Sequence, residues 1–140
     1  MTEMAFATVG NVIVALHTAN PPSEAEWAAY IAAVKTVDLR EIRAIAFTDG
    51  GAPNSAQRKA LNEALKNRAC PGVVVSASTM VRSVVTALSW FNPLVKAFSP
   101  DRAADAYRYL NLTPAEIQAV REQVRVLHAR FSTPLRCVSL

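Results

Sequence analysis

The stretch IRAIAFTDGGAPNSAQRK, residues 42–59, decides the fold of this 140-residue chain. It begins with an apolar run at 44–47 and passes through Asp49, two glycines and Pro53 into a segment with a polar face. A short unbroken apolar run is typical of a strand that is covered on both faces of its sheet. Open α/β sheets place their ligand sites in the loops that follow such strands. The stretch therefore predicts an interior strand, a functional loop and then a helix.

On the N-terminal side, residues 4–8 and 12–18 are apolar and β-branched and are separated by Gly10 and Asn11. Because glycine and asparagine tolerate the positive φ of a tight turn, this pattern predicts a β-hairpin. Ser23 and Glu26 then have the spacing of a capping box. Apolar residues follow at helical spacing and predict a first helix: Trp27, Tyr30, Ile31, Val34 and Val37.

On the C-terminal side, strands and helices are predicted to alternate. Asn54 and Gln57 cap a second helix, whose buried side is expected to consist of Ala56, Ala60, Leu61, Ala64 and Leu65. The remaining expected elements are a strand at 73–76, a helix at 78–91 that includes Val84, an edge strand at 94–98, a helix that starts at Pro100, and a helix at 113–131 opened by Thr113 and Glu116. We expect residues 132–140 to fray. The predicted class is α/β, a single domain with a mixed sheet of four to five strands flanked by helices and an added C-terminal helix.

Charge and composition narrow the classes of function. Residues 1–39 carry one basic and four acidic groups, whereas residues 40–140 carry 14 basic and 7 acidic groups, so the mild excess of +4 is unevenly distributed. The basic groups are dispersed and lack interleaved aromatic residues, which argues against a nucleic-acid partner. No apolar run approaches the ~18 residues that a membrane-spanning helix needs, and the N-terminus lacks a signal-peptide pattern. We therefore expect a cytoplasmic protein.

The sequence contains no recognisable catalytic or metal-binding constellation. Cys70 and Cys137 have no metal-ligand spacing, and His17 and His128 lie far apart without a carboxylate or cysteine at ligand spacing. We expect no enzyme activity, no metal and no cofactor.

The order of elements, together with the residues Thr48, Asp49 and Gly50 at the end of the third strand, resembles the STAS domain. That family includes anti-sigma factor antagonists and the cytoplasmic tails of sulphate transporters, and the CRAL-TRIO fold is a more distant likeness. The resemblance covers residues 4 to about 110. It implies that Asp49 corresponds to the aspartate of an Asp-Ser pair in the antagonists, whose serine a partner kinase phosphorylates. Gly50 stands at the serine position here.

Candidate site residues cluster in the loop after the third strand. They are Thr48, Asp49, Gly50, Gly51, Asn54, Ser55, Arg58 and Lys59. The two glycines beside a helix start are able to form a nest of amides for an anion, with a simple turn as the alternative. Asp49 is a candidate phosphoacceptor or general base, with a loop cap that hydrogen-bonds its own backbone as the alternative.

Two functions remain open. The favoured one is a non-enzymatic regulatory module that binds a protein partner, such as a regulatory kinase or another signalling protein, through this loop. The alternative is a domain, or weak enzyme, that binds an anionic small molecule or lipid in a crevice at the same loop. Trp90 and Phe91 are a further candidate contact, for which burial in the core, a protein partner and, least favoured, a membrane surface are considered.

Overall fold

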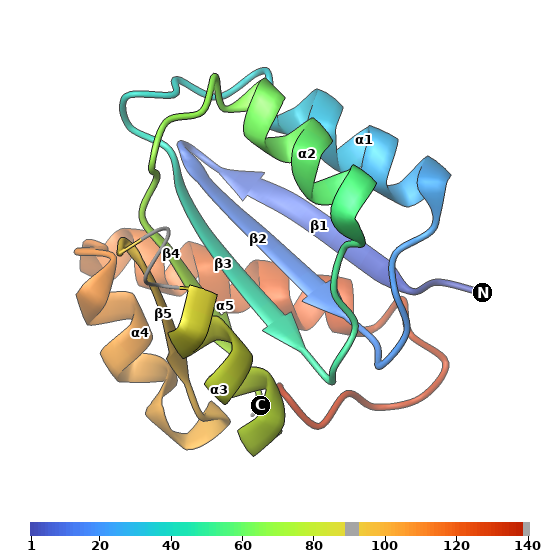
Figure 1. Cartoon of the computed structure of the whole chain (residues 1–140). Helices are drawn as coiled ribbons and strands as arrows, with labels where there is room; N and C mark the ends of the chain where they lie inside the picture. Colours follow the sequence, from blue (N-terminus) through green and yellow to red (C-terminus); the bar gives the residue numbers. More distant parts are fainter. Residues whose placement is uncertain (89–92, 139–140) are drawn as a thin grey trace.

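Five strands form one mixed sheet in the computed structural model, which describes residues 1–88 and 93–138 (Figure 1). The elements in chain order are β1 (Met4–Val9), β2 (Val12–His17), α1 (Glu24–Val34), β3 (Arg43–Thr48), α2 (Ser55–Ala64), β4 (Gly72–Val75), α3 (Thr79–Leu88), β5 (Val95–Phe98), a 3-10 turn η1 (Pro100–Arg102), α4 (Ala103–Tyr109) and α5 (Pro114–His128). The α/β class and the mixed sheet predicted from the sequence are confirmed.

The strands are ordered β1-β2-β3-β4-β5 across the sheet, so β3 is its central strand as expected. β1 and β2 pair as an antiparallel hairpin. Gly10 adopts a φ of 57° at its turn, a conformation that costs glycine little. The pairs β2–β3, β3–β4 and β4–β5 are all parallel. The carboxyl ends of four strands therefore meet at one edge of the sheet.

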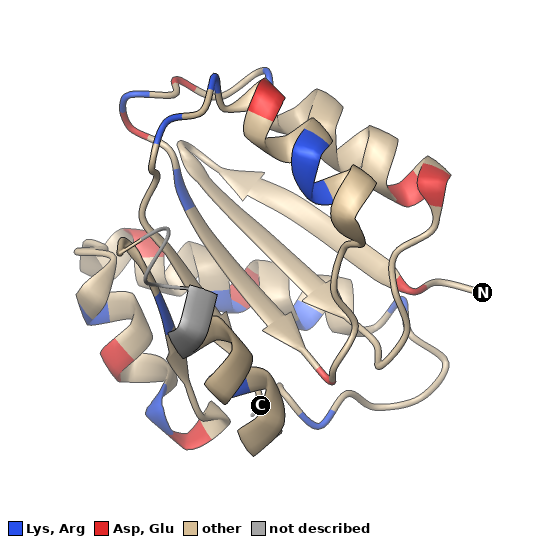
Figure 2. Cartoon of the chain, viewed as in Figure 1, with Lys and Arg blue, Asp and Glu red and all other residues tan. Residues whose placement is uncertain are grey.

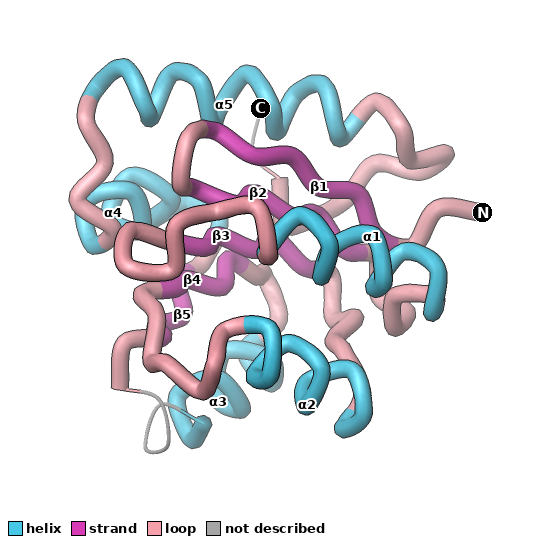
Figure 3. Tube along the Cα trace, turned by 90° about the horizontal axis from the view of Figure 1, so that it is seen from above, coloured by secondary structure: helices cyan, strands magenta, loops and turns pink. Residues whose placement is uncertain are grey.

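Helices cover both faces of the sheet (Figure 3). Side chains alternate along β2, so that Val12, Val14 and Leu16 pack with α4 and α5 while Ile13 and Ala15 pack with α1 and α2. α3 packs on β4 and β5. Because every residue of β2 is buried, this strand anchors both apolar clusters.

The starts predicted for α1, α2 and α5 are present as full capping boxes, whereas the helix predicted from Pro100 begins as the uncapped turn η1. The side chains of Ser23, Asn54 and Thr113 each accept a hydrogen bond from the backbone amide three residues on. The side chains of Glu26, Gln57 and Glu116 reach back to the corresponding cap amides. These local patterns were readable because each depends on a spacing of three residues.

Four expectations are corrected. α5 ends at His128 rather than at residue 131. The segment after it does not fray, since Leu135 and Cys137 are buried. In α2 the buried residue is Gln57, whereas Ala56 is exposed, because the polar contacts of Gln57 with the start of α1 decide which side of the helix faces inward. Val84 of α3 is also exposed, although Val85 on the same predicted apolar side is buried, so Val84 lies at the edge of that side.

Residues 89–92 lie outside the described part of the chain. The predicted contacts at Trp90 and Phe91, and the expected end of the third helix at residue 91, fall there.

Candidate functional site

The candidate loop begins at the carboxyl edge of the parallel strands, as predicted from the sequence. Thr48 ends β3 directly opposite His17, the last residue of β2. The loop then runs over residues 49–54 to the first turn of α2 (Figure 1). Its neighbours at this edge are the segment after β2 and the C-terminal segment that follows α5.

The first part of the loop is a tight turn held from within. The buried hydroxyl of Thr48 donates to the carbonyl of Gly51 over 2.7 Å and accepts the amide of Gly50 at 3.0 Å. The amide of Gly51 donates to the carbonyl of Thr18 over 2.8 Å. Both glycine amides therefore already donate within the chain, and the anion nest considered from the sequence is not formed here.

Gly51 lies against the segment that follows β2. A Cβ atom at this position would meet the carbonyl oxygen of Asn20 at 2.0 Å and that of Thr18 at 2.6 Å. Glycine is needed here because two backbones approach each other closely. Gly50, with a φ of 136°, provides the turn that leads into this contact.

Asp49 is engaged with the C-terminal segment. Its carboxylate oxygens accept the backbone amides of Arg136 at 3.0 Å and Cys137 at 2.8 Å. Asp49 thus caps backbone that is 87 and 88 residues away in sequence rather than its own loop. This contact explains why the segment after α5 is ordered.

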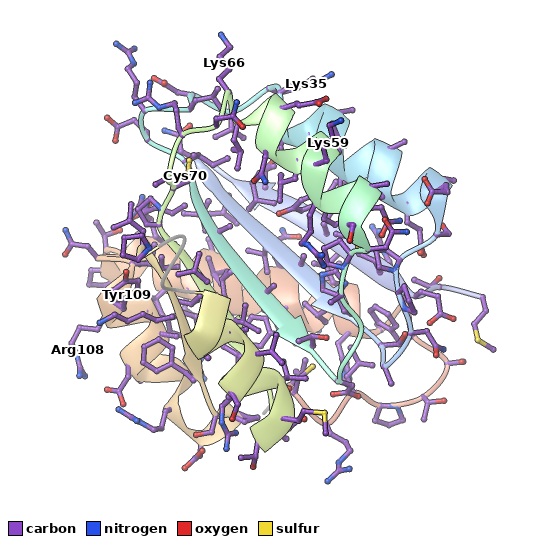
Figure 4. All side chains as sticks on the ribbon, viewed as in Figure 1. Lys35, Lys59, Lys66, Cys70, Arg108 and Tyr109 are labelled. Atoms are coloured by element: carbon purple, nitrogen blue, oxygen red, sulfur yellow. The ribbon has the colours of Figure 1, made fainter. Side chains whose placement is uncertain are left out.

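The second part of the loop carries the exposed polar side chains. Asn54 caps α2, and Ser55, Arg58 and Lys59 are exposed on its first turns. The guanidinium of Arg58 donates to the carbonyl of Pro53 over 3.0 Å and to the hydroxyl of Ser55 over 3.1 Å. Lys59 points away from α2 on the outer side of the helix layer (Figure 4). The structure therefore separates the predicted residues into an inner, fixed group and an outer, exposed group.

Distant segments determine the surroundings of three buried or half-buried polar side chains that sequence reasoning did not select. Arg43 crosses from β3 to donate to the carbonyl of Leu110 and to pair with Glu116 at 2.8 Å. Buried Gln57 donates to the carbonyl of Pro22 and to the carboxylate of Glu24, which ties α2 to the start of α1. These partners are distant in sequence, so no local pattern marked them.

His17 is the third of these residues and is buried without a hydrogen-bond partner for Nδ1. Burial lowers the pKa of His17 to about 4, and the negative charge of Glu26 opposes this shift only in part. The ring is therefore neutral at physiological pH. The sequence feature that could have indicated the burial of His17 is its position at the end of a strand that is buried on both faces.

Two cavities lie between α4 and α5, and Phe47, which precedes the loop, lines the smaller one. Their volumes are about 270 and 450 Å³, and neither is lined by any of residues 48–59. The alternative of a ligand crevice beside Gly50 thus gains no support from them. Within residues 1–88 and 93–138, no three potential ligand side chains are grouped as a metal ion would need, and no helix is long and apolar enough to cross a membrane.

Comparison of the chain with protein families, with curated proteins and with solved structures finds no match. The resemblance to the STAS domain thus stays a prediction.

Proposed function

We propose that this chain is a non-enzymatic regulatory module that binds a protein partner through the outer face of α2 and the loop before it. We define this recognition surface as Asn54, Ser55, Arg58 and Lys59. The observation that carries the proposal is the position of Arg58, which is exposed yet held by Pro53 and Ser55. A charged side chain that is already ordered loses less conformational entropy when it binds.

The rigid base under this surface supports the same proposal. Thr48 holds the loop from within, while Gly51 and Asp49 fix it to two other segments of the chain. Interfaces with pre-formed backbones change little on binding and favour a defined partner. Asp49 belongs to this base rather than to the contact surface.

Charge indicates the kind of partner. Arg58 and Lys59 are followed by exposed Lys66 and Arg68, with Glu63 as the acidic residue among them (Figure 2). Lys66 points outward at the far end of α2 (Figure 4). Such a surface fits an acidic or phosphorylated protein, since opposite charges speed association and select the partner.

The resemblance to the STAS domain adds a cellular setting to this proposal. A cytoplasmic signalling protein, such as a regulatory kinase, is the partner that the resemblance implies. Gly50 occupies the position of the phosphorylated serine, so we propose that any phosphate involved is carried by the partner. The guanidinium of Arg58 matches a phosphate better than an ammonium group does.

The test compares affinity capture by the wild-type chain with capture by the double variant Arg58→Glu, Lys59→Glu. Proteins from the native cell are quantified by mass spectrometry, and the enriched partner is then purified and titrated. We expect the double variant to lose at least about tenfold in affinity, and the wild-type affinity to fall as salt rises. Both substitutions are at exposed positions, so the free energy of unfolding, measured by thermal unfolding, should change by less than about 0.5 kcal/mol.

The matched control is Arg108→Glu with Arg130→Glu, which makes the same change in charge on the opposite helical layer. Partner affinity should be retained in this control. Equal losses in both double variants would mean that overall charge attracts the partner, and unaltered binding in the Arg58, Lys59 variant would move the interface away from α2.

A further inference from the structure

We propose that the groove between α4 and α5 binds an amphipathic monocarboxylate, with the carboxylate on Arg121 and the apolar part along the floor. The two cavities described above share Pro100, Ala103, Tyr107 and Arg121 in their linings. They are therefore adjoining parts of one groove. It lies on the opposite face of the sheet from α2, so the inference does not depend on the proposed partner surface.

The charges around the groove leave one cation without a counter-charge. Arg125 pairs with Glu122 at 2.5 Å, and Arg108 pairs with Asp105 at 2.9 Å. The side chain of Arg108 extends outward from α4 (Figure 4). Arg121 lines both cavities and makes no ion pair or hydrogen bond with any described residue.

Asp101 is the acidic group of the second cavity, and its carboxylate is already engaged. A hydrogen bond from the hydroxyl of Ser99 is the main cause that lowers the pKa of Asp101. The residues that line the groove carry three basic and two acidic groups, a net charge of +1, which matches a monoanion better than a dianionic phosphate. A guanidinium binds a carboxylate through two parallel hydrogen bonds.

The floor of the groove is apolar and aromatic. Phe47 of β3 and Val124 of α5 are buried and line the smaller cavity, and Leu112 and Ile117 line the larger one. Tyr107 lines both, and burial raises the pKa of its hydroxyl while the charge of Arg121 acts in the opposite direction. Arg121 and Tyr107 both line the two cavities and are therefore able to face the same ligand. Apolar and aromatic side chains with a few polar or charged groups are the usual lining of a small-molecule site.

Octanoate is a suitable probe because its ten non-hydrogen atoms suit the apolar floor, and octanamide is an uncharged molecule of the same shape. Each is titrated into isotope-labelled protein while amide shifts are followed by NMR. Ligand efficiencies of small molecules predict a dissociation constant of about 1 mM for octanoate. We expect shifts at the residues that line the groove and binding of octanamide that is weaker by about tenfold.

Two variants test the site itself. Arg121→Gln should weaken the binding of octanoate by about tenfold and leave the binding of octanamide unchanged. Arg130→Gln is the same change outside the groove and should alter the binding of neither probe. Ala103→Leu fills the wall shared by both cavities and should weaken both probes; its folding is checked by its NMR spectrum and thermal unfolding. The inference is overturned if octanoate shifts no groove residue at millimolar concentration, if octanamide binds equally well, or if Arg121→Gln binds octanoate like the wild type.

Discussion

The carboxylate of Asp49 accepts the backbone amide of Cys137 over 2.8 Å, although the two residues are 88 positions apart. This hydrogen bond joins the loop after the central strand to the end of the described chain. Val138, the next residue, lines the groove between α4 and α5 together with Phe47. The C-terminal segment is thus a structural part of the domain, and Asp49 holds it in place.

Replacing Asp49 by alanine should release this segment. Leaving a buried amide without its charged acceptor typically costs about 1–3 kcal/mol, and of the two amides that Asp49 accepts, that of Cys137 is partly buried and that of Arg136 is exposed. Cys137 is fully buried, and burial followed by the nearby charge of Asp49 raises the pKa of its thiol well above the ordinary value. We therefore expect Asp49→Ala to speed the reaction of Cys137 with a disulfide reagent, measured in a Cys70→Ser background so that one thiol reports.

Asp38→Asn is the control for this experiment, because Asp38 is an exposed acid whose side-chain hydrogen bonds, within the described part of the chain, are with Arg40 two residues away. It should leave the reactivity of Cys137 unchanged. If Cys137 reacted equally fast with Asp49 and with alanine at this position, burial of Leu135 and Cys137 alone would hold the segment.

Gly51 and Gly10 provide a matched pair of alanine substitutions. A Cβ at Gly51 would overlap the carbonyl oxygen of Asn20 at 2.0 Å, whereas a Cβ at Gly10 meets nothing within 4 Å. Gly51→Ala must displace backbone, so we expect it to lower the free energy of unfolding by about 2 kcal/mol or more. Gly10→Ala should lower the free energy of unfolding by about 1 kcal/mol, because alanine must adopt the positive φ of Gly10. Urea unfolding of both variants measures the difference, and equal costs would show that the loop moves freely.

The contrast between these two glycines shows what a sequence can reveal. Gly10 was readable as a turn residue because the hairpin around it is local. Gly51 was recognised as part of a loop, but its close approach to Asn20 depends on how two loops at the sheet edge pack. The partners of Asp49 and Arg43 were missed for the same reason, since they lie more than 60 residues away. Elements and caps follow from short spacings, whereas site geometry follows from contacts between distant segments.

The capping box of α1 also links this helix to β1. Besides the amide of Ser23 at 2.9 Å, the carboxylate of Glu26 accepts the amides of Glu3 and Met4 at the start of β1. Burial opposes ionisation of Glu26, but these hydrogen bonds outweigh it and hold its pKa below the ordinary value.

Ser23→Ala should therefore cost about 1 kcal/mol, while Glu26→Ala should cost about 2–3 kcal/mol because it frees three amides. Thermal or urea unfolding of the two variants tests this order. If Ser23→Ala were the more damaging substitution, the bonds of Glu26 to β1 would contribute nothing to stability.

His17 makes stability depend on pH in a defined window. Its pKa is about 4 in the folded chain and 6.5 in an unfolded one, so the unfolded state binds more protons between these values. The free energy of unfolding should therefore be highest above pH 6.5. It should fall as the pH drops toward 4, by about 3 kcal/mol in total. Urea titrations between pH 7.5 and 5.5 measure the upper part of this slope, where carboxylates with ordinary pKa values are still ionised. Because Nδ1 has no partner to lose, His17→Phe should flatten the slope while keeping a cooperative transition at pH 7. A histidine resonance that titrates near 6.5 in the folded wild type and disappears in His17→Phe would refute the burial of a neutral ring at this position.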